Sequence, residues 1–174
     1  MKISGALVAV AALLLSACST SGSSGSRNVL YDSVGELAAD SAVVVQVRPT
    51  GDTRRPSIDL DYALTGTVVE VVSSYVPVGL GTNLKEGQGQ LSTGDVVTVW
   101  QLGDGKTPGP VPLLQSHATY LLFLTWTELN FMTGEDFFVT GGGAGAWRQR
   151  DGVYVREVDE GDRLPEKLTE NDLS

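Results

Sequence analysis

The stretch "ATYLLFLTW", residues 118–126, is the most apolar strand-like segment of the chain. Side chains alternate between the two faces of a strand, so one face carries Tyr120, Leu122, Leu124 and Trp126, and the other carries Leu121 and Phe123. Both faces are therefore apolar. A strand of this kind is typical of the middle of a fold, where other elements cover it on both sides.

Further segments rich in β-branched and aromatic residues flank this stretch and predict additional strands. They cover residues 42–49, 62–72, 95–102 and 136–141, and a hairpin over 146–157. We expect the first strand to end at Pro49, because proline cannot donate to the ladder, and Gly66 to mark a bulge or bend. Asp151-Gly152 suits a type I′ hairpin turn, whose two central residues both need positive φ.

One short helix is expected near the start of the domain, over residues 34–39. Ser33 and Glu36 have the spacing of a capping box there. Six or seven short strands separated by turn signals predict a mainly β domain, either a small antiparallel barrel or a sandwich. A closed barrel leaves no exposed strand edges. This suits a chain whose single cysteine allows no internal disulfide.

The N-terminus has the features of an export signal. Met1-Lys2 precedes an uncharged apolar run, residues 3–15, which is shorter than the about 20 residues of a membrane span. Leu15-Ser16-Ala17-Cys18 then resembles the lipobox of bacterial lipoprotein signal peptides. In that family the peptide is cleaved before the cysteine, whose sulfur then carries a diacylglycerol. The resemblance implies that Cys18 is a lipid anchor and that the membrane is the first partner of this chain.

Four parts of the chain follow from this reading. Residues 1–17 are a lipoprotein signal peptide, and residues 18–28 are a lipid-anchored flexible linker, because Ser- and Gly-rich chains behave as random coil. Residues 29–157 are a β-barrel-like domain, and residues 158–174 are an acidic tail that we expect to be loosely packed. The expected location is the bacterial cell envelope, lipid-anchored on the extracytoplasmic side of the membrane.

The strand order is loosely similar to that of OB-type barrels, as in netrin-like domains. The pattern "GDVVTVW … PLL … YLLFL … FFVTGGGAGAW … DG", within residues 40–155, is similar to exported bacterial domains of unknown function. The resemblance implies a fold and no activity. Netrin-like metalloproteinase inhibitors depend on disulfides and on a free cysteine amine. This chain cannot form an internal disulfide and would acylate its cysteine.

Composition bounds the chemistry of the chain. A formal net charge of −9 excludes nucleic-acid binding through a general electrostatic field. His117 is the only histidine, which leaves too few ligands for structural zinc, and no Gly-x-Ser-x-Gly elbow is present. We therefore assign no catalytic residue, metal or cofactor. The pairs Asp59/Asp61 and Glu135/Asp136 stay open, either as calcium or acid–base groups or as solvated turn residues.

Three groups of residues are candidates for binding. Gly141, Gly142 and Gly143, followed by Trp147, could let backbone N–H groups approach an anion or could allow a sharp bend in the chain. Arg148 and Arg150, with Arg156, form a local positive spot for a carboxylate partner or a lipid headgroup, or they belong to a solvated hairpin face or pair with the acidic tail. Phe131 and Met132 lie in a loop, where they mark a partner site or fold back over the barrel end.

The sequence thus favours a non-enzymatic binding module tethered outside the membrane, with an envelope protein as its expected partner. One alternative is a small-ligand binder that uses the barrel mouth and the glycine-rich loop. The other is a hydrolase that depends on carboxylates such as Asp59, Asp61 or Glu135.

Overall fold

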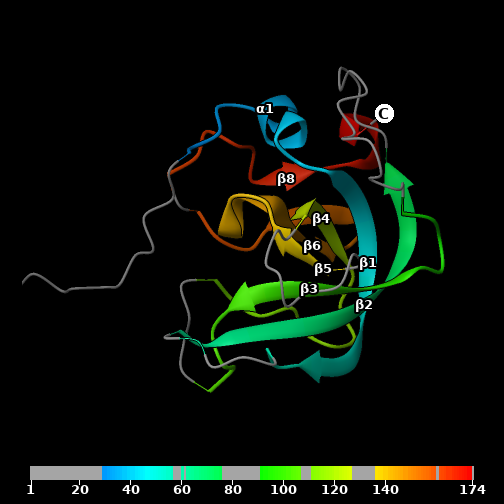
Figure 1. Ribbon diagram of the computed structural model, residues 1–174. Helices are drawn as coiled ribbons and strands as arrows, with labels where there is room; N and C mark the ends of the chain where they lie inside the picture. Colours follow the sequence, from blue (N-terminus) through cyan, green and yellow to red (C-terminus); the bar gives the residue numbers. More distant parts are fainter. Residues whose placement is uncertain are drawn as a thin grey trace, which may run out of the picture.

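The computed structural model describes residues 29–56, 60, 62–75, 91–106, 111–126, 136–159 and 161–173. One α-helix, eight strands and two 3₁₀ helices follow one another along this part of the chain (Figure 1): α1 (Val34–Ala39), β1 (Val43–Arg54), β2 (Leu64–Tyr75), β3 (Val96–Leu102), β4 (Tyr120–Trp126), β5 (Asp136–Val139), η1 (Gly142–Gly145), β6 (Ala146–Arg150), β7 (Val153–Arg156), β8 (Lys167–Leu168) and η2 (Glu170–Leu173).

Five of the strands close into a barrel in the order β1-β2-β3-β5-β4-β1. Pairing of β1 with β4, from Val43↔Leu124 to Val47↔Tyr120, joins the two ends of the sheet. All neighbours in the barrel are antiparallel except β3 and β5, which are parallel. This order is the arrangement of an OB-type barrel. The prediction of a mainly β, OB-like barrel with one short N-terminal helix is confirmed, and the sandwich alternative is not observed.

Strand β4 is central and contributes to two cores, as its alternation predicts. Tyr120, Leu122 and Leu124 point into the barrel, where they pack with the inward valines of β1, β2 and β3. Leu121 and Phe123 point to the other side, into a second core that α1, β6, β7 and β8 cover. Strand β1 is divided in the same way, with Val44 in the second core and its odd-numbered neighbours in the barrel.

A glycine-rich segment carries the chain from the barrel to the second layer. Strands β5 and β6 both run antiparallel to β4, on the edge opposite β1. Val139 pairs with Leu124 and Ala146 pairs with Leu122, so most of the intervening chain loops out of the ladder as η1. A Cβ on Gly145 would lie 2.5 Å from the Thr140 carbonyl oxygen and 2.9 Å from that of Phe123. Glycine is therefore required where η1 packs against the barrel wall.

The second layer consists of the β6–β7 hairpin, β8 and α1. Asp151 and Gly152 have φ values of 51° and 78°, as a type I′ turn requires. Helix α1 begins as predicted, with the Glu36 N–H donating to Ser33 Oγ at 3.2 Å. In Figure 1, α1 and β8 lie together at the top of the view, whereas β2 and β3 cross the lower part of the barrel.

One local expectation for the strands is wrong. Strand β1 continues through Pro49 to Arg54: Pro49 itself pairs with Val69, and the register shifts only between Pro49 and Thr53. Gly66 forms no bulge against β3, since the β2–β3 register runs without interruption, and the alternative of a bend stays a prediction. A Cβ at this position would lie 2.7 Å from Thr98 Cγ2 and 3.0 Å from the Trp100 ring, so glycine leaves room for both side chains.

The acidic C-terminal segment also differs from the expectation of a loosely packed tail. Leu164, Leu168 and Leu173 are buried in the second core. The Tyr31 N–H donates to Asp162 Oδ1 at 2.9 Å, and the Arg163 N–H donates to the Tyr31 carbonyl at 3.0 Å. The three leucines supply the apolar surface that folding needs, while most of the acids stay exposed.

Replacing Gly145 tests the packing of η1. Gly145→Ala should destabilise the domain by about 1–3 kcal/mol, because the added methyl group meets backbone atoms that cannot move independently. The free energy of unfolding from urea titration measures this effect. Gly35→Ala in α1, where the nearest heavy atom to a Cβ is Ser33 Oγ at 3.8 Å, is the control and should be neutral or stabilising. Equal effects at the two positions would contradict the close packing.

The C-terminal segment can be tested with an adjacent pair of substitutions in β8. Leu168→Ala should lower the free energy of unfolding by about 2–5 kcal/mol, because it removes a buried side chain from the second core. Lys167→Ala, at the exposed neighbouring position, should change it by less than about 0.5 kcal/mol. Thermal unfolding of both variants makes the comparison, and a tolerated Leu168→Ala would show that the segment does not contribute to the core.

Candidate binding surface

The β6–β7 hairpin places two of its arginines on one face and the third on the other. Arg148 lies opposite Val155, and Arg150 lies opposite Val153. Arg156 lies opposite Trp147 and therefore shares the face that points into the second core. The single positive spot expected from the sequence is thus divided: Arg148 and Arg150 form one surface, and Arg156 belongs to the interior.

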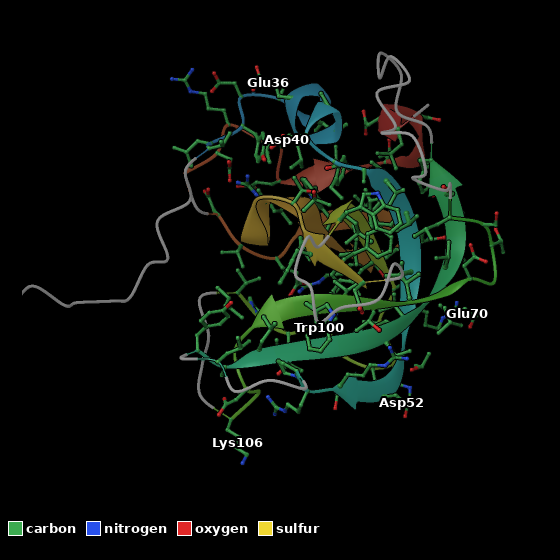
Figure 2. All side chains as sticks on the ribbon, in the orientation of Figure 1. Glu36, Asp40, Asp52, Glu70, Trp100 and Lys106 are labelled. Atoms are coloured by element: carbon green, nitrogen blue, oxygen red, sulfur yellow. The ribbon has the colours of Figure 1, made fainter. Side chains whose placement is uncertain are left out.

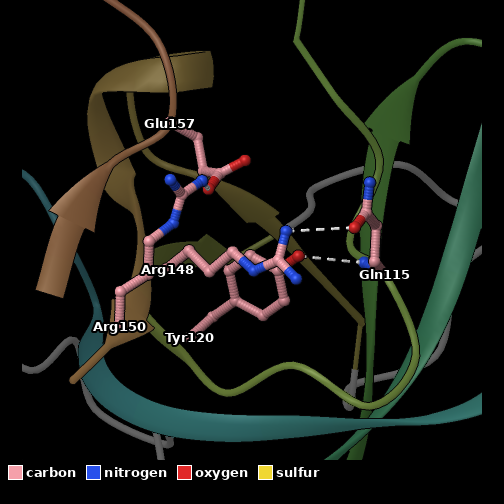
Figure 3. Close-up of polar contacts among 5 residues, drawn as sticks. All are labelled: Gln115, Tyr120, Arg148, Arg150 and Glu157. Carbon is pink, nitrogen blue, oxygen red and sulfur yellow. Dashed lines mark hydrogen bonds and ion pairs between the residues drawn. The ribbon is translucent and has the colours of Figure 1, made fainter. Parts of the chain in front are cut away.

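Arg148 covers one mouth of the barrel. It pairs with Tyr120, whose side chain points into the barrel core. Arg148 Nη1 donates to Gln115 Oε1 at 3.1 Å, and the Gln115 N–H donates to the Tyr120 hydroxyl at 3.1 Å, as Figure 3 shows. Gln115 belongs to the loop between β3 and β4, so this chain of contacts connects that loop to β6 across the end of the barrel.

Arg150 has a local carboxylate partner. Its Nη2 lies 3.3 Å from Glu157 Oε1, and its side chain is 58% exposed. An exposed pair of this kind contributes at most about 1 kcal/mol, so a stronger acceptor could displace Glu157. Arg148 and Arg150 therefore present a cationic surface whose geometry is set by Gln115 and Glu157.

Burial and charge act on Tyr120 in opposite directions. Burial raises the pKa of the Tyr120 hydroxyl above its usual value, because the ionised form loses solvation. The donated hydrogen bond from the Gln115 N–H and the positive charge of Arg148 lower the pKa, but by less. The hydroxyl therefore stays protonated at neutral pH, where it acts as a hydrogen-bond acceptor for the loop.

The glycine segment and Trp147 lie together, but away from the surface of Arg148 and Arg150. Gly143, Ala144 and Gly145 are buried, whereas Gly142 is exposed. Trp147 is fully buried, with its ring centroid 5.3 Å from that of Phe123 and the two rings tilted by 55°. Of the two readings of these glycines, the structure favours a bend in the chain, and Trp147 contacts the second core rather than an external partner.

Several candidate residues fall outside the part of the chain that the structure describes. They are Cys18, Asp59, Asp61, Phe131, Met132 and Glu135. His117 is described, and it is exposed in the loop before β4 with a positive φ of 67°. For these residues the roles inferred from sequence stay predictions.

Asp136 is the acid whose environment the sequence predicts least well. Its side chain is buried, and Trp100 Nε1 donates to its Oδ1 at 3.0 Å. This bond fastens β3 to β5 on the outside of the barrel, where the two strands are parallel. The pairing is not local in sequence, so no nearby pattern indicates it. Asp136 is a structural acceptor and not a solvated turn residue.

A second polar cluster lies at the edge of the second core. Tyr154 accepts a hydrogen bond from Gln46 Nε2 at 2.8 Å, and its hydroxyl lies 3.3 Å from that of Tyr75. Ser73 donates to Gln46 Oε1 at 3.2 Å and so completes the cluster. Burial and the adjacent Tyr75 raise the pKa of Tyr154 well above its usual value. Tyr154 is therefore a neutral hydrogen-bonding group at physiological pH.

Within the described residues, no three histidine, cysteine or acidic side chains are grouped so that they could hold a metal ion. Among the same residues no helix is long and apolar enough to cross a membrane. No protein-family model matches the chain, and neither the curated proteins nor the solved structures contain a match to it.

The raised pKa of the buried Tyr120 hydroxyl predicts that the protein loses stability at alkaline pH. The pKa of Tyr120 is raised in the folded state, so its contribution is complete below the unfolded value of about 10 and is lost as the pH rises above it. Unfolding free energies between pH 8 and 11.5 should fall less steeply for Tyr120→Phe than for the parent protein. Tyr62→Phe removes a hydroxyl from an exposed position and is the control. If the free energy of unfolding falls equally steeply with pH in the parent and in Tyr120→Phe, ionisation of Tyr120 is not the cause of the loss.

Proposed function

We propose that this chain is a lipid-anchored protein of the bacterial cell envelope and that its barrel is a non-enzymatic binding module. Two observations support this proposal: a motif in the sequence, and the position at which the folded domain begins. Leu15-Ser16-Ala17-Cys18 has the form of a lipobox, and Tyr31 is the first buried residue of the described chain. A modified cysteine at position 18 would therefore lie close to the domain without being part of its core.

Twelve residues, 19–30, lie between Cys18 and Tyr31. A random coil of this length spans roughly 17–21 Å. Such a tether would keep the domain next to the membrane surface on its extracytoplasmic side and would let it search for a partner there. With two or more acyl chains the anchoring would be stable, because each buried CH₂ contributes about 0.8 kcal/mol.

The first described residues lie at the end of the molecule that carries α1 and β8, so the tether would enter there. Tyr31 is fixed there by its contacts with Asp162 and Arg163. Figure 2 shows Glu36 and Asp40 at this end and Asp52 and Lys106 at the opposite end. The end of β1 around Asp52 and the loop around Lys106 would thus point away from the anchor, where an envelope protein could reach them.

Features of this distal end support binding. Tyr62 and Leu102 are large apolar residues that are 50% and 46% exposed. Arg55 donates to Thr65 Oγ1 in β2 and to the Asp104 carbonyl in the segment after β3, each at 3.0 Å. It therefore connects the start of β2 to the end of β3. Exposed aromatic and aliphatic side chains on a rigid support are typical of the centre of a protein interface.

The two alternative functions make different demands on the molecule. A ligand inside the barrel would have to displace a packed apolar core, and Arg148 and Gln115 already bridge one mouth. A hydrolase would depend on Asp59, Asp61 or Glu135, which lie outside the described residues. The binding module requires neither a cavity nor a reactive carboxylate, so it agrees best with the packed barrel.

The anchor is tested by Cys18→Ala. In bacteria that acylate lipoproteins, the parent protein should be found in the membrane fraction and should incorporate a labelled fatty acid. Cys18→Ala should lose the label and leave the membrane fraction, because it lacks the sulfur that the lipid modifies. Ser24→Ala, a change in the same linker, is the control. An unlabelled parent protein, or a Cys18→Ala variant that carries the same label, would contradict the anchor.

Binding is tested by crosslinking in intact cells, followed by mass spectrometry of proteins captured with the full-length chain. We expect one dominant exported or membrane protein, whose capture falls at least tenfold in the double variant Tyr62→Ala, Leu102→Ala. Val96→Ala, an exposed apolar position at the other end of β3, should leave capture unchanged. No specific partner with two crosslinker lengths would count against the binding module and would direct attention to a small ligand or substrate.

A further inference from the structure

The described part of the chain contains buried donors that lack acceptors. Three buried side-chain nitrogen atoms have no hydrogen-bond partner among the residues that the structure describes: Trp126 Nε1, Trp147 Nε1 and Arg156 Nη1. Trp147 and Arg156 are directly opposed across the β6–β7 ladder. Two of these donors thus belong to one antiparallel pair in the interior of the second layer.

The register places the two side chains on the same face of the hairpin. Opposed residues of an antiparallel pair have Cβ atoms about 4.5–5.5 Å apart. Trp147 is fully buried, and the Arg156 side chain is only 5% exposed. The indole and the guanidinium therefore extend from directly opposed positions on the interior face of the hairpin, next to the point where η1 leads into β6.

The charge of Arg156 is only partly compensated. Its Nη2 lies 3.1 Å from Asp159 Oδ1, but the Asp159 side chain is 74% exposed. An exposed carboxylate is well solvated and screened, so it compensates a buried guanidinium weakly. Arg156 Nη1, on the buried side of the same group, has no acceptor within the described chain. A buried cation with an unpaired N–H is unfavourable, which indicates that an acceptor is needed there.

We propose that Trp147 Nε1 and Arg156 Nη1 together bind one small monovalent anion of the halide class. Indole and guanidinium groups donate hydrogen bonds and accept none. A water molecule held by both groups would accept from each and would still need acceptors for its own two hydrogens. A halide accepts from both donors, carries no hydrogens that need acceptors and neutralises the guanidinium.

Such a site would make stability depend on the halide concentration. A ligand that binds only the folded state stabilises it in proportion to the logarithm of its concentration, once that exceeds the dissociation constant. General screening also acts on a protein with a net charge of −9. The specific effect must therefore be measured against a larger anion at equal ionic strength.

The experiment is thermal unfolding of the full-length protein in sodium chloride, sodium bromide or sodium gluconate at matched ionic strength. The melting temperature should be higher in the two halides and should rise by a constant step for each tenfold increase in halide. Arg156→Met, which keeps the length of the side chain, should abolish the difference between chloride and gluconate. Arg163→Met, whose side chain is 81% exposed, should retain it.

A second measurement uses the parent protein, so its result does not depend on whether Arg156→Met folds. Anomalous diffraction from crystals of the parent protein in bromide should show a peak within hydrogen-bond distance of both Trp147 Nε1 and Arg156 Nη1. A parent protein with equal melting temperatures in all three salts would overturn the proposal. A halide effect that persists in Arg156→Met, or bromide peaks only elsewhere, would also overturn it.

Discussion

The apolar character of both faces of β4 is the constraint on which the rest of the molecule depends. A strand with leucines and aromatic residues on each side must be covered twice, and burying each such side chain contributes about 1.5–3 kcal/mol. The barrel covers Leu122 and Leu124, and the second layer covers Leu121 and Phe123. The glycine-rich η1 is what lets one chain do both, since it moves from barrel strand β5 to β6 along the same edge of β4.

Local patterns were sufficient for most of the elements and for the fold class. The Ser33 cap, the Asp151-Gly152 turn and the β-branched runs each depend on neighbours in sequence, so they could be identified from the sequence alone. The strand end expected at Pro49 is a local error, whereas the other errors concern contacts between distant residues. The parallel β3–β5 pair and the packing of Leu168 on the second core depend on the closed tertiary structure, and an acidic composition concealed the latter.

The facing of the three hairpin arginines can be predicted from the sequence, because the turn fixes the register of the ladder. A two-residue turn at Asp151-Gly152 places Arg150 opposite Val153, and counting back along the ladder places Arg156 opposite Trp147. Alternation then separates Arg156 from Arg148 and Arg150. The acceptors that these side chains find could not be foreseen in the same way, because Gln115 approaches from a loop that is brought near only when the barrel closes.

The attachment of Tyr31 to residues 162 and 163 has a mechanical consequence. A force applied through the N-terminal chain would reach the C-terminal segment through this contact before it reached the barrel. That segment is joined to the sheet by β8, whose ladder with β7 has only two residue pairs, whereas β1 is held by β2 and β4 along both edges. Under tension the two hydrogen bonds of Tyr31 and the short β8 ladder would therefore yield while the closed barrel stayed intact.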